Sequence, residues 1–148
     1  MTLRIRPARP ADIESAKTLL HDAGLPTGDL TAEHLALVAD QDGEFLGVVG
    51  LESFAEVALL RSLVIDTSAR GTGIGPALVT ALETASSCDG VQEMWLLTID
   101  ADAFFLKLGY KVRDRSEAPD VIQTTEEFSS LCPGDAVLMS KSLTRRLQ

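Results

Sequence analysis

The stretch LLRSLVIDTSARGTGIGPALVTALETASSC, from Leu59 to Cys88, decides the fold of this chain. Its first part, 59–65, is an apolar run bounded by an aspartate, which predicts a buried strand. Its last part has apolar residues at helical spacing, which predicts an amphipathic helix. Three glycines fall between them, and glycines weaken both helix and strand. The sequence therefore predicts a strand, a tight glycine turn and a helix.

The start of such a helix is suited to bind an anion. Its first N–H groups have no partner within the helix, and the helix dipole places positive potential there. Each hydrogen bond to a charged group contributes about 1.5–3 kcal/mol. Three or four could supply most of the roughly 8 kcal/mol that micromolar binding requires. Pro76 fits the first helical turn, because its missing N–H breaks no helical bond.

The glycine spacing separates three kinds of phosphate loop. A dinucleotide fingerprint counted from Gly71 needs glycine where Pro76 stands, and a Walker loop needs Gly-Lys-Ser/Thr, which is absent. The spacing that holds is Arg-x-x-Gly-x-Gly, with Arg70, Gly73 and Gly75. This resembles the acyl-CoA pyrophosphate loop of the GNAT superfamily of N-acyltransferases. A simple tight turn is the alternative, but such a turn needs one glycine rather than three.

Composition limits the function classes. The 148 residues fit one domain, 1–148, with an ample core. The net charge of −9 argues against nucleic acid as the main partner. No long apolar run begins the sequence, so we expect no signal peptide and no membrane span. Cys88 and Cys132 lie far apart without metal-ligand spacing, which favours a reduced, cytoplasmic protein.

The remaining elements are expected on both sides of the central stretch. Asp12 is expected to cap the first helix, and Thr31 a short helix within 28–33. An Asp-Gly turn predicts a hairpin, and a crossover helix makes the two central strands parallel. A connection is expected over 52–57 and a frayed tail over 144–148. The strands are expected at Leu3–Arg6, Leu35–Ala39, Phe45–Leu51, Leu59–Ile65, Met94–Thr98, Tyr110–Arg113 and Ala136–Ser140, and the other helices at Ile13–Ala23, Ala101–Leu108 and Glu117–Ser130.

The order of these elements also resembles the GNAT fold, over nearly the whole chain. The family's second hallmark, A-x-x-x-Y-x-x-x-G-F, has its counterpart in ADAFFLKLGY, residues 101–110. The resemblance implies an α/β (α+β) fold. It has a mixed, mostly antiparallel central sheet, a splayed parallel strand pair, and helices on both faces.

The same resemblance implies acetyl-CoA as a co-substrate and no metal. In the family, the acyl-CoA arm lies between the splayed strands. Backbone groups of Leu63, Val64 and Ile65 would pair with the pantetheine and polarise the thioester. Arg70 and the backbone amides of the loop would hold the pyrophosphate; these amides belong to Gly71, Thr72, Gly73, Ile74 and Gly75.

Phe105 departs from the family pattern. It stands where a tyrosine often protonates the leaving thiolate, and we place it among the CoA-binding residues. Phenylalanine cannot donate a proton, so the commonest general acid is missing. A thiol has a reference pKa near 8.5, so a thiolate is a tolerable leaving group near neutral pH. Water or Thr98 could take the role of the acid.

A more specific resemblance is to GNAT proteins associated with arsenic-resistance operons. The Leu-Leu-Thr and Phe-Phe segments also resemble amino-acid acetyltransferases that acetylate glutamate. Both resemblances imply an acceptor that is a small amine bearing an anionic group. The segments that carry the arsenic-associated resemblance are Gly50-Leu51-Glu52, Leu59-Leu60-Arg61-Ser62-Leu63, Leu96-Leu97-Thr98, Phe104-Phe105, Gly109-Tyr110 and Phe128-Ser129-Ser130-Leu131-Cys132-Pro133.

Arg61 is a charged residue in an otherwise apolar strand, so it needs a partner or a cavity. One interpretation is an ion pair with Glu52 or Glu56. The other is a clamp for an acceptor carboxylate through the guanidinium fork. Strand alternation places residues 59, 61, 63 and 65 on one face and 60, 62 and 64 on the other. Ser62 is either a filler between packed layers or a contact to the acceptor.

Glu52 is the candidate general base. An α-amino group has a pKa near 8, so a weak base acting through water suffices for an amino-acid-like acceptor. The alternative is a solvated carboxylate at a strand end. Thr98 ends the partner strand, where its hydroxyl is either a site group or a residue of high β-propensity.

These residues favour an acetyl-CoA-dependent N-acetyltransferase acting on a small, amino-acid-like amine, such as an arsenical or a related xenobiotic. Glutamate acetylation is the second enzymatic hypothesis. A CoA-binding sensor without catalysis is the third, because of Phe105. The apolar C-terminal strand allows a homodimer.

Overall fold

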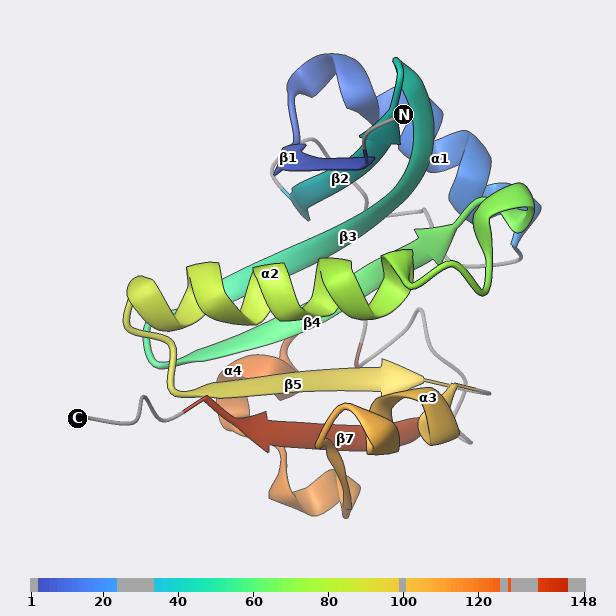
Figure 1. Ribbon diagram of the computed structural model, residues 1–148. Coiled ribbons are helices and arrows are strands. Elements are labelled where there is room, and N and C mark those ends of the chain that lie inside the picture. Colours follow the sequence, from blue (N-terminus) through green and yellow to red (C-terminus); the bar gives the residue numbers. More distant parts are fainter. Residues whose placement is uncertain (1–2, 24–33, 99–100, 126–127, 129–135, 144–148) are drawn as a thin grey trace, which may run out of the picture. The chain divides into compact units, whose positions relative to one another are not determined.

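The computed structural model describes residues 3–23, 34–98, 101–125, 128 and 136–143 (Figure 1). The strands are β1 (Leu3–Pro7), β2 (Leu35–Gln41), β3 (Glu44–Phe54), β4 (Val57–Ile65), β5 (Glu93–Thr98), β6 (Lys111–Arg113) and β7 (Val137–Ser142). The α-helices are α1 (Ile13–Asp22), α2 (Ile74–Cys88), α3 (Asp102–Lys107) and α4 (Asp120–Gln123). Short 3₁₀ turns are η1 (Pro10–Asp12), η3 (Thr67–Ala69) and η4 (Arg115–Glu117).

The seven strands form one sheet in the order β1-β2-β3-β4-β5-β7-β6. The pairs β1–β2, β2–β3, β5–β7 and β6–β7 are antiparallel. The pair β4–β5 is parallel, with a register from Val57 opposite Glu93 to Leu59 opposite Trp95. The mixed, mostly antiparallel sheet and the parallel pair are therefore confirmed.

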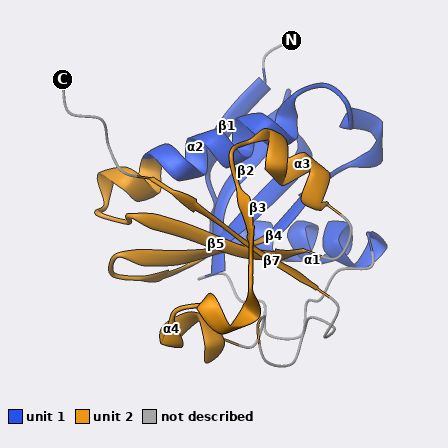
Figure 2. Ribbon diagram, turned by 90° about the horizontal axis from the view of Figure 1, so that it is seen from below, with its two compact units in different colours: residues 1–51, 62–84 blue, residues 52–61, 85–148 orange. Residues whose placement is uncertain are grey.

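The chain falls into two compact units (Figure 2). Unit 1 comprises residues 1–51 and 62–84, and unit 2 comprises residues 52–61 and 85–148. Strands β3 and β4 and helix α2 each contribute residues to both units. The organisation of 1–148 as a single domain stays a prediction.

In unit 1, helices α1 and α2 cover opposite faces of the strands. Val48 packs in a buried cluster with Ala16 and Leu20 of α1. The adjacent Gly47 points the other way, because a Cβ there would lie 3.3 Å from Cδ1 of Leu78 in α2. That Cβ would also lie 2.8 Å from Cδ1 of Ile65. It would lie 3.2 Å from the Val64 carbonyl oxygen as well, so a side chain at position 47 has little room.

The β2–β3 hairpin confirms the Asp-Gly turn. Asp42 and Gly43 both have positive φ, at 54° and 83°, as a type I′ turn requires. Strand β3 then runs farther than expected, through Glu52 to Phe54. The expected connection over 52–57 is therefore wrong in extent, since only the turn residues 55 and 56 separate β3 from β4.

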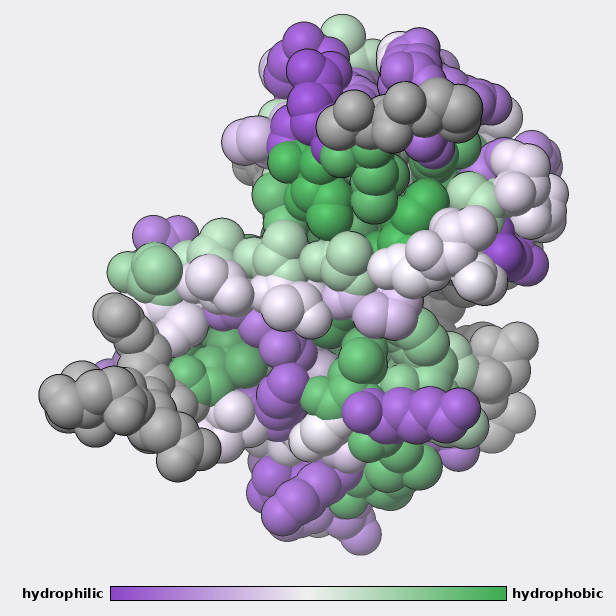
Figure 3. Space-filling view, in the orientation of Figure 1, coloured by the Kyte–Doolittle hydropathy of each residue, from purple (hydrophilic) through white to green (hydrophobic). Residues whose placement is uncertain are grey.

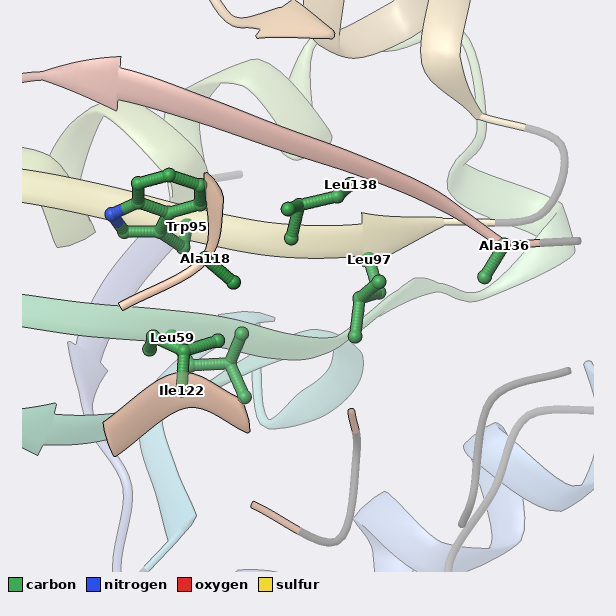
Figure 4. Close-up of a cluster of buried hydrophobic side chains, with 7 residues drawn as sticks. All are labelled: Leu59, Trp95, Leu97, Ala118, Ile122, Ala136 and Leu138. Atoms are coloured by element: carbon green, nitrogen blue, oxygen red, sulfur yellow. The ribbon is translucent and has the colours of Figure 1, made fainter. Parts of the chain in front are cut away.

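The core of unit 2 is an apolar cluster that joins three strands to the segment around α4 (Figure 4). Its seven buried residues are Leu59, Trp95, Leu97, Ala118, Ile122, Ala136 and Leu138, and Phe54, Val57 and Phe128 pack against them. Leu138 of β7 belongs to this cluster together with Ile122 of α4. Three residues on, Lys141 donates to the Leu108 carbonyl oxygen at 2.8 Å. The end of α3 and helix α4 therefore lie on opposite faces of β7.

Arginines and aspartates form a charged network in unit 1. Arg6 donates to both carboxylate oxygens of Asp12, at 2.9 and 3.0 Å, and to Asp40 at 2.7 Å. Arg4 makes a two-bonded contact with Asp40, at 3.1 Å for each bond. Hydrophilic side chains gather over this end of the unit, where η1 and the β2–β3 turn lie (Figure 3). Hydrogen bonds from Arg4 and Arg6 lower the pKa of Asp40 to about 2.

Three local predictions are wrong. Asp12 does not cap α1 with its side chain, because that carboxylate is taken by Arg6 and by the backbone N–H of Arg9. The continuous helix expected over 117–130 is interrupted, because Glu117 belongs to η4, α4 covers four residues, 124–125 are not helical, and Phe128 lies in a separate helical turn. The continuous strand alternation over 59–65 fails at Ser62, whose φ is 60°. The helix expected within 28–33 and the frayed tail over 144–148 lie outside the described residues.

Candidate active site

The glycine loop of unit 1 joins β4 to α2. Gly71 and Gly73 have φ values of 81° and 89°, and a Cβ at either position would meet no atom within 4 Å. Both positions therefore combine a backbone that side chains rarely adopt with open space beside it. The Gly73 carbonyl oxygen accepts a hydrogen bond from Ala77 at 3.2 Å, which begins α2.

Two side chains hold this loop in place. The Arg70 Nε donates to the Ile65 carbonyl oxygen at 3.1 Å, which ties the loop to the end of β4. The Thr72 hydroxyl donates to the Ala69 carbonyl oxygen. Arg70 is itself exposed, so its positive charge stands at the surface beside the glycines. The loop therefore presents an exposed guanidinium and the unpaired N–H groups of a helix start.

The residues expected to contact pantetheine follow an irregular point in β4. Ser62 has a left-handed backbone in mid-strand, where extended values are the rule. Such a residue turns the strand. The alternation of side-chain faces before it therefore does not continue regularly after it. Leu63 and Ile65 are half-buried, and Val64 is buried. The carbonyl of Ile65 is already bonded to Arg70, which leaves one of its two lone pairs for a ligand.

In unit 2, Arg61 and Glu52 form an ion pair. Arg61 Nη1 donates to Glu52 Oε2 at 2.8 Å. The Arg61 side chain is 0% exposed, whereas that of Glu52 is 16% exposed. Of the two interpretations of Arg61, the structure shows the ion pair and selects Glu52 as the partner. The contact exists because β3 is long enough to bring Glu52 beside β4.

Thr98 and Phe105 lie near the start and middle of α3. The Thr98 hydroxyl oxygen accepts from the Ala101 N–H at 3.0 Å, so it also caps the turn into this helix. Phe105 is 4% exposed, and its ring meets those of Phe104 and Tyr110 edge to face. The centroid distances are 4.9 and 5.5 Å. Phe105 is therefore a packed side chain, as an apolar residue at this position would be.

Arg115 is a candidate functional residue that the sequence did not single out. It begins η4, and its guanidinium lies over the Phe128 ring, 4.5 Å from the centroid. Its Nη1 is buried without a hydrogen-bond partner. In the sequence it is one arginine in a polar stretch, and no spacing distinguishes it.

Within the described part of the chain, no group of three or more His, Cys, Asp or Glu side chains is placed to hold a metal ion. No helix in that part of the chain is long and apolar enough to cross a membrane.

Known proteins with similar sequence and structure were compared with the chain. It is 33% identical over 93 residues to an uncharacterized N-acetyltransferase of Chlorobaculum tepidum, covering 61% of this chain and 59% of that relative. N-acetylglutamate synthase from Neisseria gonorrhoeae, complexed with coenzyme A and N-acetyl-glutamate, superposes with a TM-score of 0.84 at 17% identity. That match covers 98% of this chain and 36% of the synthase chain.

A Mycobacterium tuberculosis protein in complex with CoA superposes with a TM-score of 0.77 at 20% identity, covering 95% of this chain and 99% of that one. These likenesses show a shared fold. The model of the acetyltransferase (GNAT) domain matches residues 32–112, which are more than half of the 148. That span includes the hairpin, the glycine loop and the hallmark segment of α3, and the chain therefore belongs to the GNAT acetyltransferase family.

Proposed function

We propose that this protein transfers an acetyl group from acetyl-CoA to the amine of a small, amino-acid-like acceptor. The observation that carries the proposal is the loop between β4 and α2. It has two open glycines at positive φ, followed by a helix of 15 residues. Membership of the GNAT family supports acetyl-CoA as the group that the loop binds.

The CoA pyrophosphate accepts hydrogen bonds from the backbone N–H groups of the loop and of the start of α2. These N–H groups belong to Gly71, Thr72, Gly73, Ile74 and Gly75. Each hydrogen bond from a backbone N–H to a phosphate oxygen is charge-assisted and short. The exposed guanidinium of Arg70 adds a cation beside them. The chain's net charge of −9 repels CoA only at long range, because salt screens charges beyond about 8 Å.

The reaction is a direct attack by the acceptor amine on the thioester carbonyl carbon. A C–N bond forms, the C–S bond breaks, and CoA leaves as its thiolate. Backbone groups of Leu63, Val64 and Ile65 orient the pantetheine and polarise the carbonyl. Ser62 directly precedes these residues, and its φ of 60° makes the strand irregular there.

Glu52 receives the proton that the amine releases, directly or through one water. Its carboxylate is 16% exposed, so water can reach it, and it is bonded to the buried Arg61. Water, or the Thr98 hydroxyl, returns a proton to the thiolate. In this scheme, Arg61 holds the Glu52 carboxylate in place. Ser62 stays a candidate contact to the acceptor.

The acceptor class rests on sequence resemblance. Similarity to arsenic-operon GNAT proteins favours an arsenical or related xenobiotic amine, and the Leu-Leu-Thr and Phe-Phe segments favour glutamate. Both are small amines that carry an anionic group. A cytoplasmic setting fits the two widely separated cysteines, and the homodimer stays a prediction.

A second candidate is a CoA-binding sensor that does not catalyse transfer. The observation that favours it is Phe105, which is buried and packed between Phe104 and Tyr110 where a proton-donating tyrosine is common. A sensor would bind CoA with the same loop and release no thiol with any amine.

One assay separates these functions. Thiol release from acetyl-CoA is measured with free amino acids, phosphinic and arsenical amino acids, and polyamines, while thermal stability is recorded with CoA alone. Amine-dependent release with an acidic amino acid supports the transferase. Stabilisation by CoA without release for any amine supports the sensor.

A further inference from the structure

The three described arginines of unit 2 differ in their charge partners. Arg61 is bonded to Glu52 at 2.8 Å, and Arg113 to Glu117 at 3.2 Å. Within the part of unit 2 that the structure describes, Arg115 has no carboxylate within ion-pair distance. It is half-buried, so its charge is partly removed from water without a compensating anion.

The contacts of Arg115 orient its guanidinium but do not satisfy it. Nη2 donates to the Phe128 carbonyl oxygen at 3.2 Å, and Cζ lies 4.5 Å from the centroid of the Phe128 ring. Nη1 is buried and has no acceptor. A buried donor without an acceptor is costly, and a bound molecule is one source of the acceptor that it lacks.

The carboxylates next to Arg115 in the sequence are engaged elsewhere. Asp114 accepts hydrogen bonds from the N–H and hydroxyl of Ser116, at 3.0 and 2.9 Å, and these bonds lower its pKa. Glu117 accepts from Arg113 and from the Asp114 N–H, which lowers its pKa as well. Both stay ionised and fixed in the η4 turn. The turn therefore anchors the backbone of Arg115 and leaves its guanidinium for another anion.

The position of Arg115 connects it to the proposed catalytic residues of the same unit. Phe128, on which it stacks, packs against the cluster of Figure 4. Phe54 packs against the same cluster and lies two residues after Glu52 on β3. Leu97 belongs to the cluster, whereas Thr98, the next residue of β5, faces the other side of that strand. Arg115 therefore contacts one residue that packs against this cluster, and Glu52 lies two residues from another.

We infer that Arg115 binds the anionic group of the acceptor, an inference that rests on the proposed acetyl transfer. The guanidinium offers a planar donor edge, which matches a carboxylate or an oxyanion such as a phosphinate or an arsonate. Arg61, whose side chain is fully buried and bonded to Glu52, positions the base instead. The acceptor thus carries its amine toward Glu52 and its anion toward Arg115.

The test compares acceptor binding and turnover in wild type, Arg115→Gln, Arg115→Lys and the control Arg113→Gln. Arg113→Gln removes the same charge two residues away, from an arginine already bonded to Glu117 and Ser140. Acceptors are glutamate, its side-chain amide, which keeps the α-carboxylate, its diamide, which has no anionic group, and a phosphinic analogue. Binding is measured by calorimetry in the presence of CoA, independently of turnover.

Arg115→Gln should weaken binding of an anionic acceptor by about 10- to 100-fold, the loss expected for one charge-assisted contact. Binding of the acceptor that lacks the recognised anion, and the KM for acetyl-CoA, should change little. Arg115→Lys should fall between wild type and Arg115→Gln, and Arg113→Gln should match wild type. Whichever anion loses affinity in Arg115→Gln identifies the recognised group.

Equal losses for anionic and neutral acceptors, or equal effects of Arg113→Gln and Arg115→Gln, would overturn the inference. If Arg115→Gln fails to fold, the ratio of anionic to neutral affinity in Arg115→Lys decides in the same way. An enzyme that binds the acceptors but releases no thiol would contradict acetyl transfer and leave the role of Arg115 intact. Failure of the Arg115 inference and failure of the proposed acetyl transfer are therefore distinguishable.

Discussion

The guanidinium of Arg61 is fully buried and donates to the carboxylate of Glu52 at 2.8 Å, across the hairpin that β3 and β4 form. The pair joins an interior cation to a carboxylate that water still reaches. Removing either partner therefore has unequal consequences. Loss of the carboxylate leaves a buried charge, and loss of the arginine frees a surface carboxylate to move.

Glu52→Gln should lower kcat by about 100-fold, the low end for removal of a general base. The amide keeps the shape and can still accept from Arg61, but it cannot take a proton. The KM for acetyl-CoA should stay near that of wild type. The measurement is steady-state thiol release across pH, with partial recovery expected at high pH where more of the acceptor amine is neutral. A kcat equal to that of wild type would remove Glu52 from the mechanism.

Arg61→Met should lower the free energy of unfolding by only about 1 kcal/mol, because the carboxylate that it leaves behind is reached by water. In the folded fraction, kcat should fall while the acceptor KM changes less. Urea unfolding and steady-state kinetics check the two parts. Arg61→Lys, which keeps the charge, should recover part of kcat. A selective rise in acceptor KM would instead support Arg61 as the acceptor clamp.

Gly73→Asp should abolish measurable CoA binding, because it places a carboxylate where the pyrophosphate is expected. The matched control is Gly43→Asp. Gly43 has a φ of 83°, compared with 89° at Gly73, and a Cβ added at either position would meet no atom within 4 Å. Gly43 lies in the β2–β3 turn, away from the loop. Both variants carry similar backbone strain and the same added charge. Calorimetry with CoA should show loss in Gly73→Asp only, and unchanged affinity there would refute the loop assignment.

Unfolding should become easier in acid because of Asp40. Hydrogen bonds from Arg4 and Arg6 lower its folded-state pKa to about 2, below the unfolded value of about 3.9. The contribution of Asp40 is therefore complete above about pH 4 and is lost as pH falls toward 2. Asp40→Asn should be less stable than wild type at pH 7, and the gap should shrink toward pH 2.

Asp42→Asn is the control for this prediction. It removes an aspartate from the tip of the same hairpin, at an exposed position with a φ of 54° that asparagine adopts readily. Its pH profile of the free energy of unfolding should parallel that of wild type. A gap between Asp40→Asn and wild type that stays constant from pH 7 to pH 2 would contradict the role of the charged network.

Much of the fold follows from local sequence chemistry. The strand, the glycine turn and α2 were predictable because apolar spacing and glycine placement act within a few residues. Asp42-Gly43 fixed the hairpin for the same reason. The parallel direction of β4 and β5 follows from the helix that connects them.

The details of the candidate site depend on contacts that the spacing of residues in the sequence does not predict. The partner of Arg61 was open between Glu52 and Glu56, and the length of β3 decided it. Nothing in the sequence predicts the left-handed backbone of Ser62, since glycine or asparagine is the usual residue in that conformation. Arg115 stands out only because Asp114, Glu117 and Arg113 bond to other groups, which requires the folded η4 turn.

The most direct test of acetyl transfer is the product itself, measured with wild type and Gly73→Asp against the panel of small amines. The account predicts equal amounts of free CoA thiol and N-acetylated acceptor from wild type, fastest with amino acids that carry an anionic group, and neither product from Gly73→Asp. Thermal stabilisation of wild type by CoA, with no acetylated amine from any acceptor, would contradict the account and identify a CoA-binding sensor.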